Sequence, residues 1–222
     1  MKPRRARADD RLYIVGVTGG IASGKSTLVE LLAGAMPSVV VDADALGHGI
    51  LQRPDVARAL EAEFGSDVLD EEGNVQRSVL GPRAFASPER LAVLDEITRP
   101  PLLALVESVL SGCAERAFEG LVVLDAALLV EWDKGPWCDR VVAVIADPAR
   151  RVERLVRRTG LPRPEAERRV AAQLPDAARG EYADDLIAND GTIEEFRAAS
   201  GRLAGRIAAD ARSALAARVR LG

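Results

Sequence analysis

Cysteine, histidine and long apolar runs are scarce in this 222-residue sequence, and each shortage excludes a class of protein. The two cysteines, Cys113 and Cys138, stand far apart without a Cys-x-x-Cys pair. We therefore expect reduced thiols and neither a disulfide framework nor a cysteine metal site. His48 is the single histidine, which excludes a histidine cluster around a metal. No apolar run reaches the roughly eighteen residues that a membrane span needs, so no membrane partner is expected.

Lysine is also rare, because it occurs only as Lys2, Lys25 and Lys134. Arginine supplies the remaining positive charge, so a single arginine is weak evidence for a functional site. The net charge of −4 gives no reason to expect nucleic acid as a partner. Residues 1–11 are basic and polar and lack the apolar centre of a secretory signal. We expect a solvated arm there, on a cytoplasmic protein.

The most specific motif is the segment Gly19–Thr27, which fits the phosphate-binding pattern G-x-x-x-x-G-K-[ST]. Glycines let the backbone curl so that its N–H groups face an anion, and the helix that follows adds its positive end. Lys25 should reach the β- and γ-phosphates of a nucleotide, and Ser26 should offer its hydroxyl to Mg²⁺. The residues expected to hold the nucleotide are Gly20, Ile21, Ala22, Ser23, Gly24, Lys25, Ser26 and Thr27.

Short apolar runs that alternate with helical patterns predict an α/β fold with a parallel sheet buried on both faces. The predicted strands are Leu12–Val17, Val39–Asp42, Leu121–Asp125, Val141–Ala146 and Leu186–Asn189. In such a fold the ligand binds at the carboxyl ends of the strands.

The interval from Ala45 to Gly120 is too long for a simple crossover and predicts a helical insertion that covers the strand tips. Its predicted helices are Asp55–Phe64, Val75–Phe85, Pro88–Ile97 and Pro101–Phe118.

Two further helical regions follow the predicted fourth strand. An arginine-rich helix, Pro148–Thr159, is broken by prolines and followed by a second helix from Glu165 to about Leu174, and the pair is typical of a lid. The pattern from Ile193 to Arg220 predicts a long C-terminal helix. Its expected buried stripe is Phe196, Leu203, Ile207 and Leu215.

Carboxylates at the ends of predicted strands are candidates for the chemistry. Asp42 and Asp44 lie two apart in a segment taken as extended, so both would face the phosphate loop, and one could accept a substrate proton. Solvated turn residues that cap the next helix are the alternative. Asp125 could hold Mg²⁺ directly or through water, or be a turn residue. Glu131 could line the site or be paired structurally.

Arg151, Arg154 and Arg158 share one face of the predicted lid helix by their spacing. Guanidinium groups match phosphate oxygens, so mobile lid arginines would suit phosphoryl transfer. The alternative is a solvated basic face, which fits Arg150 and Arg157 better than Arg154 and Arg158.

The motifs together resemble the dephospho-coenzyme A kinase family, over most of the chain. Val17–Thr27 looks like the family's T-G-G-I-x-S-G-K-S opening, and Val41–Asp44 looks like its D-A-D segment. Asp125–Glu131 is similar to its D-x-P-L-L-x-E element, and Ala183–Asn189 to its A-D-x-V-I-x-N ending. The residues that follow its insertion and lid patterns are Phe64, Gly65, Gly73, Arg77, Arg154, Leu155, Arg158, Arg169 and Gln173.

The resemblance implies a P-loop nucleotide-kinase-like three-layer fold with a five-stranded parallel sheet, a helical insertion and a lid. The implied nucleotide-binding core is residues 11–44, 121–147 and 175–222, the acceptor-binding insertion is 45–120, and the lid is 148–174. It also implies ATP and Mg²⁺ as cofactors and dephospho-coenzyme A as the acceptor, phosphorylated on its ribose 3′-hydroxyl.

Roles for single residues also come from the resemblance. Asp44 is implied as the base, Lys25 as the phosphate ligand and Arg154 as the lid arginine at the reaction centre. Arg158 is expected on the nucleotide and Asn189 near its adenine. The expected acceptor-side residues are Asp42, Arg77, Asp125, Leu128 and Glu131.

This chain departs from the family pattern at three positions. Ala22 replaces a common glycine, which should be tolerated if its φ is negative, and Ala127 replaces a proline. Arg99 stands where the family commonly has histidine, and arginine cannot shuttle a proton near neutral pH. Two other functions stay open on the residues alone: another small-metabolite kinase, for a nucleoside or nucleotide, and a nucleotide-dependent switch without an acceptor.

Overall fold

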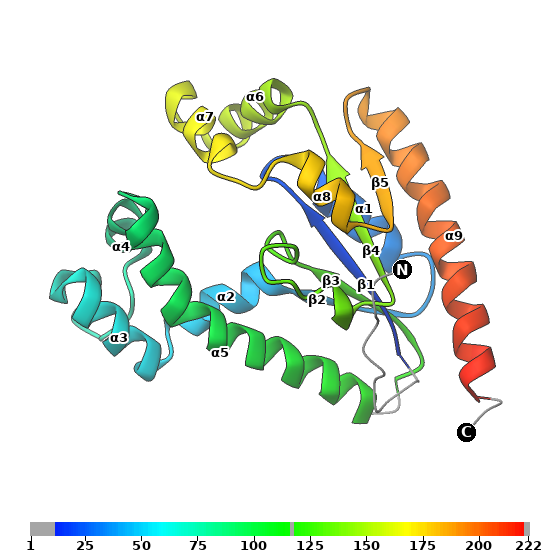
Figure 1. The fold of residues 1–222 in the computed structure, drawn as a ribbon, viewed down its shortest axis with the longest axis horizontal. Coiled ribbons are helices and arrows are strands. Elements are labelled where there is room, and N and C mark those ends of the chain that lie inside the picture. The colour runs from blue at the N-terminus through cyan, green and yellow to red at the C-terminus, as the bar shows by residue number, and fades with distance from the viewer. Residues whose placement is uncertain (1–11, 116–117, 220–222) are drawn as a thin grey trace. The chain divides into compact units, whose positions relative to one another are not determined.

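The computed structural model describes residues 12–115 and 118–219, and the expected N-terminal arm lies outside this part. Strands and helices alternate along the chain, as predicted (Figure 1). The strands are β1 (Leu12–Gly19), β2 (Ser38–Asp42), β3 (Gly120–Asp125), β4 (Arg140–Ile145) and β5 (Asp185–Ala188). Each lies within two residues of its predicted bounds. The strands β1, β3 and β4 are buried almost throughout, as such apolar runs predict, whereas only Val41 of β2 and Ile187 of β5 are buried in the two remaining strands.

The five strands form one parallel sheet in the order β2-β3-β1-β4-β5. β1 is central and pairs with β3 on one side and β4 on the other, with Val17 opposite both Asp125 and Val142. The carboxyl end of β1, where the phosphate loop begins, is therefore flanked by the carboxyl ends of two neighbouring strands. The predicted α/β class and parallel sheet are confirmed.

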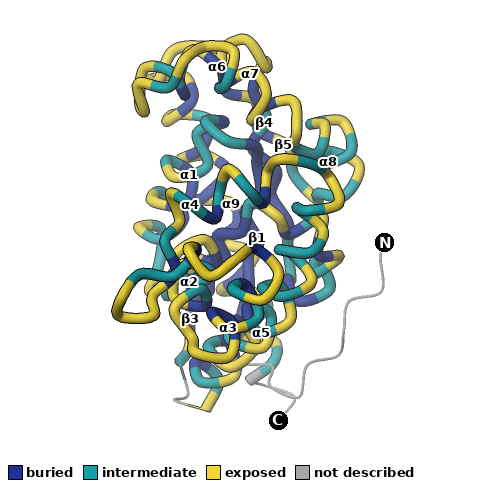
Figure 2. The backbone as a smooth tube through the Cα atoms, turned by 90° about the vertical axis from the view of Figure 1, so that its left-hand side faces the viewer, coloured by how far each residue is buried: buried dark blue, intermediate teal, exposed yellow. Residues whose placement is uncertain are grey.

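Helices α1 (Lys25–Ala33) and α9 (Ile193–Val219) pack together on one face of the sheet. Phe196, Leu203 and Ile207 of α9 are buried there, and Leu215 packs against the same cluster, as the predicted stripe requires. On α6 (Pro148–Thr159) and α7 (Arg163–Ala171), Figure 2 shows largely exposed backbone with a narrow buried side. These two helices, α6 and α7, pack on each other through a small separate cluster.

A seven-residue helix, α8 (Asp176–Tyr182), precedes β5 and contacts β1 and β4. It was not predicted from the sequence. The 3₁₀ turn η2 (Gly135–Trp137) precedes β4. Among the described residues, no helix is long and apolar enough to cross a membrane.

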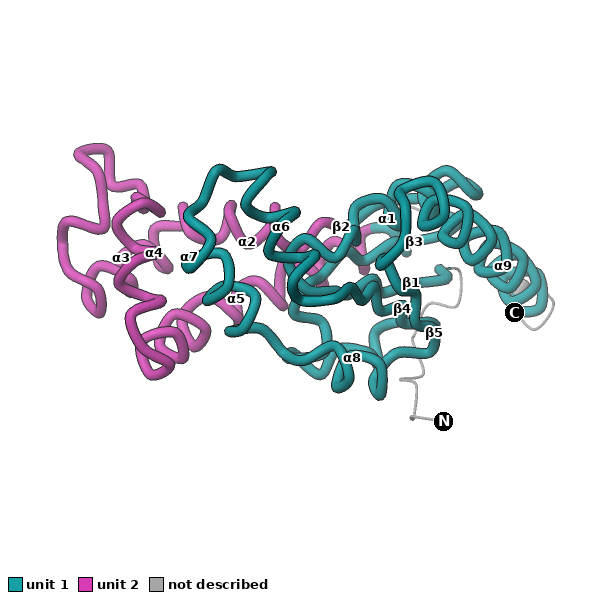
Figure 3. The backbone as a smooth tube through the Cα atoms, turned by 90° about the horizontal axis from the view of Figure 1, so that it is seen from above, with its two compact units in different colours: residues 1–41, 113–222 teal, residues 42–112 magenta. Residues whose placement is uncertain are grey.

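The chain divides into two compact units, residues 1–41 with 113–222, and residues 42–112 (Figure 3). The second unit holds α2 (Ala43–Leu51), α3 (Pro54–Phe64), the 3₁₀ turn η1 (Ser66–Val68), α4 (Arg77–Ala84) and most of α5 (Pro88–Glu115). The insertion expected at 45–120 and this unit, 42–112, cover nearly the same residues.

Helix α5 corrects one prediction, because Pro100 and Pro101 lie inside it and do not separate two helices. An internal proline costs about 3 kcal/mol of helix stability. Leu102, Val106 and Leu110 are buried along the part that follows the prolines. Burial of each such side chain gives about 1.5–3 kcal/mol, which offsets the cost and keeps the helix continuous.

Candidate active site

The phosphate loop leaves β1 at Gly19 and enters α1 at Lys25, so it has the strand–loop–helix context that the motif requires. Gly24 is the N-cap of α1 with a φ of 104°, a conformation that favours glycine. Two backbone bonds tighten the loop: Ser23 N–H to the Gly20 carbonyl at 3.0 Å, and Thr27 N–H to the Gly24 carbonyl at 3.1 Å.

Ala22 adopts a φ of 60°, so the negative φ under which alanine should be tolerated at this position is not met. A left-handed conformation costs a non-glycine residue about 1–2 kcal/mol. Ala22 packs, with Ile21, against the small cluster of α6 and α7 that contains Val152 and Leu155. These contacts offset the backbone cost and attach the loop to α6 and α7.

Lys25 forms an ion pair with Asp125, which lies at the carboxyl end of β3 and is only 8% exposed. The parallel register of β1 and β3 brings this carboxylate beside the loop. Ser26, on the first turn of α1, is exposed. Mg²⁺ prefers oxygen ligands such as hydroxyl and carboxylate groups. The Ser26 hydroxyl and the Asp125 carboxylate are therefore chemically suited to the Mg²⁺ that accompanies a nucleotide.

Arg154 and Asn189 meet beside the phosphate loop. Arg154 Nη2 donates to the Asn189 carbonyl at 2.8 Å and to Asn189 Oδ1 at 3.3 Å. Asn189, 5% exposed, donates from Nδ2 to the Ser23 carbonyl at 2.7 Å. Arg154 Nη1 and Ser23 Oγ are buried and have no acceptor or donor among the described residues. A buried donor without a partner is costly, so both atoms are suited to a ligand.

The three arginines expected on one helix face differ in environment. Arg151 is 3% exposed and donates from Nε to the Ile21 carbonyl at 3.1 Å, so it is held against the loop backbone and is neither mobile nor part of a solvated face. Burial lowers the pKa of Arg151 below its ordinary value. Arg154 is half-buried, and Arg158 is exposed. Of the three, Arg154 is the one with a buried donor left over.

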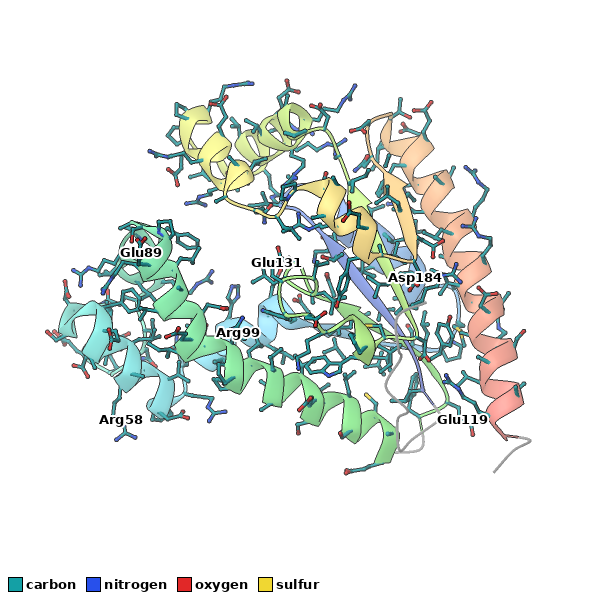
Figure 4. All side chains as sticks on the ribbon, in the orientation of Figure 1. Arg58, Glu89, Arg99, Glu119, Glu131 and Asp184 are labelled. Atoms are coloured by element: carbon teal, nitrogen blue, oxygen red, sulfur yellow. The ribbon has the colours of Figure 1, made fainter. Side chains whose placement is uncertain are left out.

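Glu131 lies on the segment between β3 and η2, where Figure 4 labels it. Its Oε1 accepts from Nη2 of Arg179 at 3.0 Å, and Arg179 is completely buried in α8. The structural pairing weighed for Glu131 is therefore present. Leu128, on the same segment, is 39% exposed, which leaves an apolar side chain available to a ligand.

In the second unit, Asp42 and Asp44 do not share an extended segment, which corrects the geometry expected for them. Asp42 is the N-cap of α2 and accepts from Ala45 N–H at 2.9 Å, so the helix begins one residue later. Asp44 lies in the first turn of α2 and is exposed. The capping role weighed as the alternative holds for Asp42.

Two arginines of the second unit were also singled out. Arg77 is the first residue of α4 and is exposed. Arg99 lies on α5, where Figure 4 labels it, and pairs with Asp95 one turn earlier at 3.0 Å. The half-exposed pair contributes little to stability.

Comparisons with known proteins agree with this geometry. Residues 13–195 match the family model described as dephospho-CoA kinase. The chain is 39% identical to the dephospho-CoA kinase of Corynebacterium efficiens over 197 residues, 87% of this chain and 96% of that one. It is 36% identical to that of Geobacter metallireducens over 185 residues, 83% of this chain and 91% of that one.

Solved structures share the fold of this chain. TT1252 from Thermus thermophilus has a TM-score of 0.70 at 32% identity, over 87% of this chain and 97% of that one. The dephospho-CoA kinase of Campylobacter jejuni has a TM-score of 0.60 at 20% identity, over 89% and 98%, and shows the shared fold. The chain belongs to the dephospho-CoA kinase family. Membership in a kinase family implies ATP as co-substrate.

Sequence reasoning from the dephospho-CoA kinase pattern missed three roles near the phosphate loop. Gln173 accepts from the Ile21 N–H at 2.7 Å, Arg151 holds the Ile21 carbonyl, and Arg179 supports Glu131. Gln173 followed the family's lid pattern, which was the available signal. Arg151 and Arg179 gave no such signal, because a single arginine is weak evidence in a chain with so many of them.

Proposed function

We propose that this protein transfers the γ-phosphoryl group of ATP to the ribose 3′-hydroxyl of dephospho-coenzyme A, the last step of coenzyme A biosynthesis. We place the reaction in the cytoplasm. The core, residues 11–44, 121–147 and 175–222, would bind ATP. Residues 45–120 would bind the acceptor and 148–174 would form the lid.

The observation that carries the proposal is the hydrogen bonding of the two terminal nitrogens of Arg154. One of its terminal nitrogens is fixed by Asn189, which also holds the Ser23 carbonyl of the phosphate loop, and the other is buried without a described acceptor. A fixed guanidinium with an unused donor beside a phosphate loop is arranged to bind a phosphate oxygen. Because no reorganisation is needed when charge develops, such a donor stabilises a phosphoryl-transfer transition state.

Lys25 and Asp125 would change partners when ATP binds. Their ion pair keeps the ammonium ordered beside the loop, and β- and γ-phosphate oxygens would compete with Asp125 for it. Ser26, with Asp125 directly or through water, would hold Mg²⁺. The metal, when bound, neutralises charge on the phosphates. The loop backbone from Gly20 to Thr27 would supply the N–H groups around the phosphates.

Acceptor activation is assigned to Asp44. Its carboxylate is exposed, and Asp42 rather than Asp44 makes the capping bond, so Asp44 is free of that structural task. It would accept the proton of the 3′-hydroxyl as the oxygen attacks phosphorus. Asp42 and Arg77 would bind the acceptor from the insertion, and Leu128 and Glu131 from the segment after β3. Arg158 would reach the nucleotide from the exposed side of α6.

Mass detection of coenzyme A tests this function directly. The purified chain with ATP, Mg²⁺ and dephospho-coenzyme A should produce a species one phosphoryl group heavier than the acceptor. Adenosine, uridine and AMP, offered at the same concentration, should be phosphorylated far more slowly.

The two alternative functions predict other outcomes of the same assay. A nucleoside or AMP that outcompetes dephospho-coenzyme A would identify a different small-metabolite kinase. ATP binding with slow hydrolysis and no phosphorylated acceptor would identify a nucleotide-dependent switch.

A further inference from the structure

Arg151 is buried in a helix whose other arginines are at least partly solvated. It is 3% exposed, whereas its neighbour Arg150 and the later Arg157 are exposed. Removing a guanidinium from water costs several kcal/mol unless its donors find acceptors. The partners of Arg151 should therefore explain why this one side chain is buried.

Those partners belong to the phosphate loop and to the base of the lid, by which we mean Gln173, just after α7, and Asp176, the first residue of α8. Arg151 Nε donates to the Ile21 carbonyl at 3.1 Å, and Nη2 donates to Gln173 Oε1 at 2.6 Å. Nη1 lies 3.4 Å from Asp176 Oδ1. Gln173 Oε1 also accepts from the Ile21 N–H at 2.7 Å. Both backbone groups of Ile21 are thus held, one by Arg151 and the other by the amide that Arg151 fixes.

Gly20 shows how closely the guanidinium approaches the loop. A Cβ atom at this position would overlap the terminal nitrogens and Cζ of Arg151. The φ of Gly20 is not in the left-handed region, so space, rather than backbone conformation, is what requires glycine here. The guanidinium occupies the volume that any other residue at position 20 would fill.

We propose that Arg151 is a positioning residue for ATP, whose guanidinium fixes the Gly20–Ile21 part of the phosphate loop against the base of the lid helices. A loop held in this way presents its remaining N–H groups to phosphates without first losing conformational freedom. The inference rests on the proposed function only in taking ATP as the ligand, and the acceptor plays no part in it.

The test measures binding of the non-hydrolysable analogue AMP-PNP with Mg²⁺ by titration calorimetry. Arg151→Met keeps the apolar stem and removes the donors, and it should raise the Kd about tenfold, in line with the loss of hydrogen bonds to a charged group. Arg151→Lys keeps the charge, but its donors lie on one nitrogen, whereas the guanidinium contacts its three partners from three separate nitrogens. The Arg151→Lys protein should therefore bind AMP-PNP as weakly as the Arg151→Met protein. Arg150→Met, one residue earlier and exposed, is the matched control and should bind like the wild type.

Restored affinity in Arg151→Lys would overturn the inference, because charge alone would then be sufficient. Unchanged affinity in Arg151→Met would overturn it as well. Failure of the wild-type protein to bind AMP-PNP would instead reject the proposed function, which keeps the two results distinguishable.

A double-mutant cycle with Gly20→Ala probes the same contact without depending on one variant. Gly20→Ala should weaken binding in the wild-type background by displacing the guanidinium, and should add little in the Arg151→Met background. Amide exchange of residues 19–27 should be faster in Arg151→Met, in Gly20→Ala and in Gln173→Met, so the contact can be tested even if one of them folds poorly. Penalties that multiply independently, or unchanged exchange in all folded variants, would overturn the proposal.

Discussion

At the scale of single residues, several side chains around the phosphate loop are held by backbone carbonyl groups. Asn189 donates to the Ser23 carbonyl, Arg151 to the Ile21 carbonyl, and Thr18 Oγ1 to the Ala127 carbonyl at 3.0 Å. A backbone acceptor cannot change its rotamer, so each contact fixes a side chain and a loop segment together. Substitutions here should alter ligand binding more than overall stability.

Asp42 and Asp44 should respond differently to substitution. Asp44→Asn should lower kcat by about 10²–10⁴-fold, because asparagine cannot accept the proton, while the ATP Kd stays nearly unchanged. Asp42→Ala should cost about 1 kcal/mol of stability through loss of the cap of α2, and Asp42→Asn should retain most of it. Steady-state kinetics and urea unfolding measure both effects. Normal turnover in Asp44→Asn would move the base to another carboxylate.

Ala22 offers a test of the loop's backbone. At a φ of 60°, Ala22→Val should destabilise the protein by about 1 kcal/mol beyond the strain that alanine already carries, because a β-branched residue tolerates this conformation still less. Ala22→Gly should be close to neutral, since relief of backbone strain is balanced by a more flexible unfolded chain. Thermal unfolding of the pair measures the difference. Equal stability of the two variants would contradict the observed conformation.

At the scale of elements, the sequence was informative wherever a long apolar pattern decided the structure. The strands β1, β3 and β4 and the buried stripe of α9 could be predicted because each buries a regular face, whereas β2 and β5 bury little and were predicted from their short apolar runs. Helix α8 could not, because its seven residues are too few to show a period. Pro100 and Pro101 led to a wrong prediction of two helices in place of α5. The low helix propensity of proline is outweighed by the burial of the apolar residues that follow, and this burial is known only from the folded unit.

The site divides in the same way. The phosphate loop was predictable because its pattern specifies backbone geometry directly. The burial of Arg151 and the capping by Asp42 were not, since each depends on which partner the fold brings near. An arginine that serves the loop and an arginine in solvent look alike in sequence.

The segment after β3 is attached to α8 through Tyr182, and this attachment should weaken at alkaline pH. The Gly135 N–H donates to Tyr182 Oη at 2.8 Å, and Tyr182 donates to Asp133 Oδ1 at 3.0 Å. Burial raises the pKa of Tyr182 from 10.0 to about 12. The folded state therefore holds this proton more tightly than the unfolded state does. Its contribution is complete below pH 10 and is lost as the pH rises towards 12.

Tyr182→Phe removes this ionisation and should flatten the fall in unfolding free energy over that pH range. Urea unfolding of both proteins at a series of alkaline pH values measures the difference. Parallel decline in the two proteins would assign the alkaline loss to other groups, among them Tyr13, whose pKa burial also raises.

At the scale of the whole molecule, nucleotide binding should stabilise the first compact unit, because the phosphate-loop contacts described above belong to it. The loop, Asp125, Arg154 and Asn189 are contributed by β1, β3, α6 and the end of β5. A ligand that bridges these elements binds the folded state alone. Its binding free energy is therefore added to the free energy of unfolding.

ATP with Mg²⁺ at about 100 times its Kd should add about 2.7 kcal/mol to the unfolding free energy, which corresponds to a rise in Tm of roughly 5–10 °C for a chain of this size. Lys25→Ala should lose most of this rise, measured from the Tm of its own free protein, because the phosphates lose their ammonium partner. Lys134→Ala is the matched control, since Lys134 lies over the Trp137 ring and not on the loop. Thermal shifts at several ATP concentrations measure the effect, and a full shift in Lys25→Ala would show that Lys25 does not bind the phosphates.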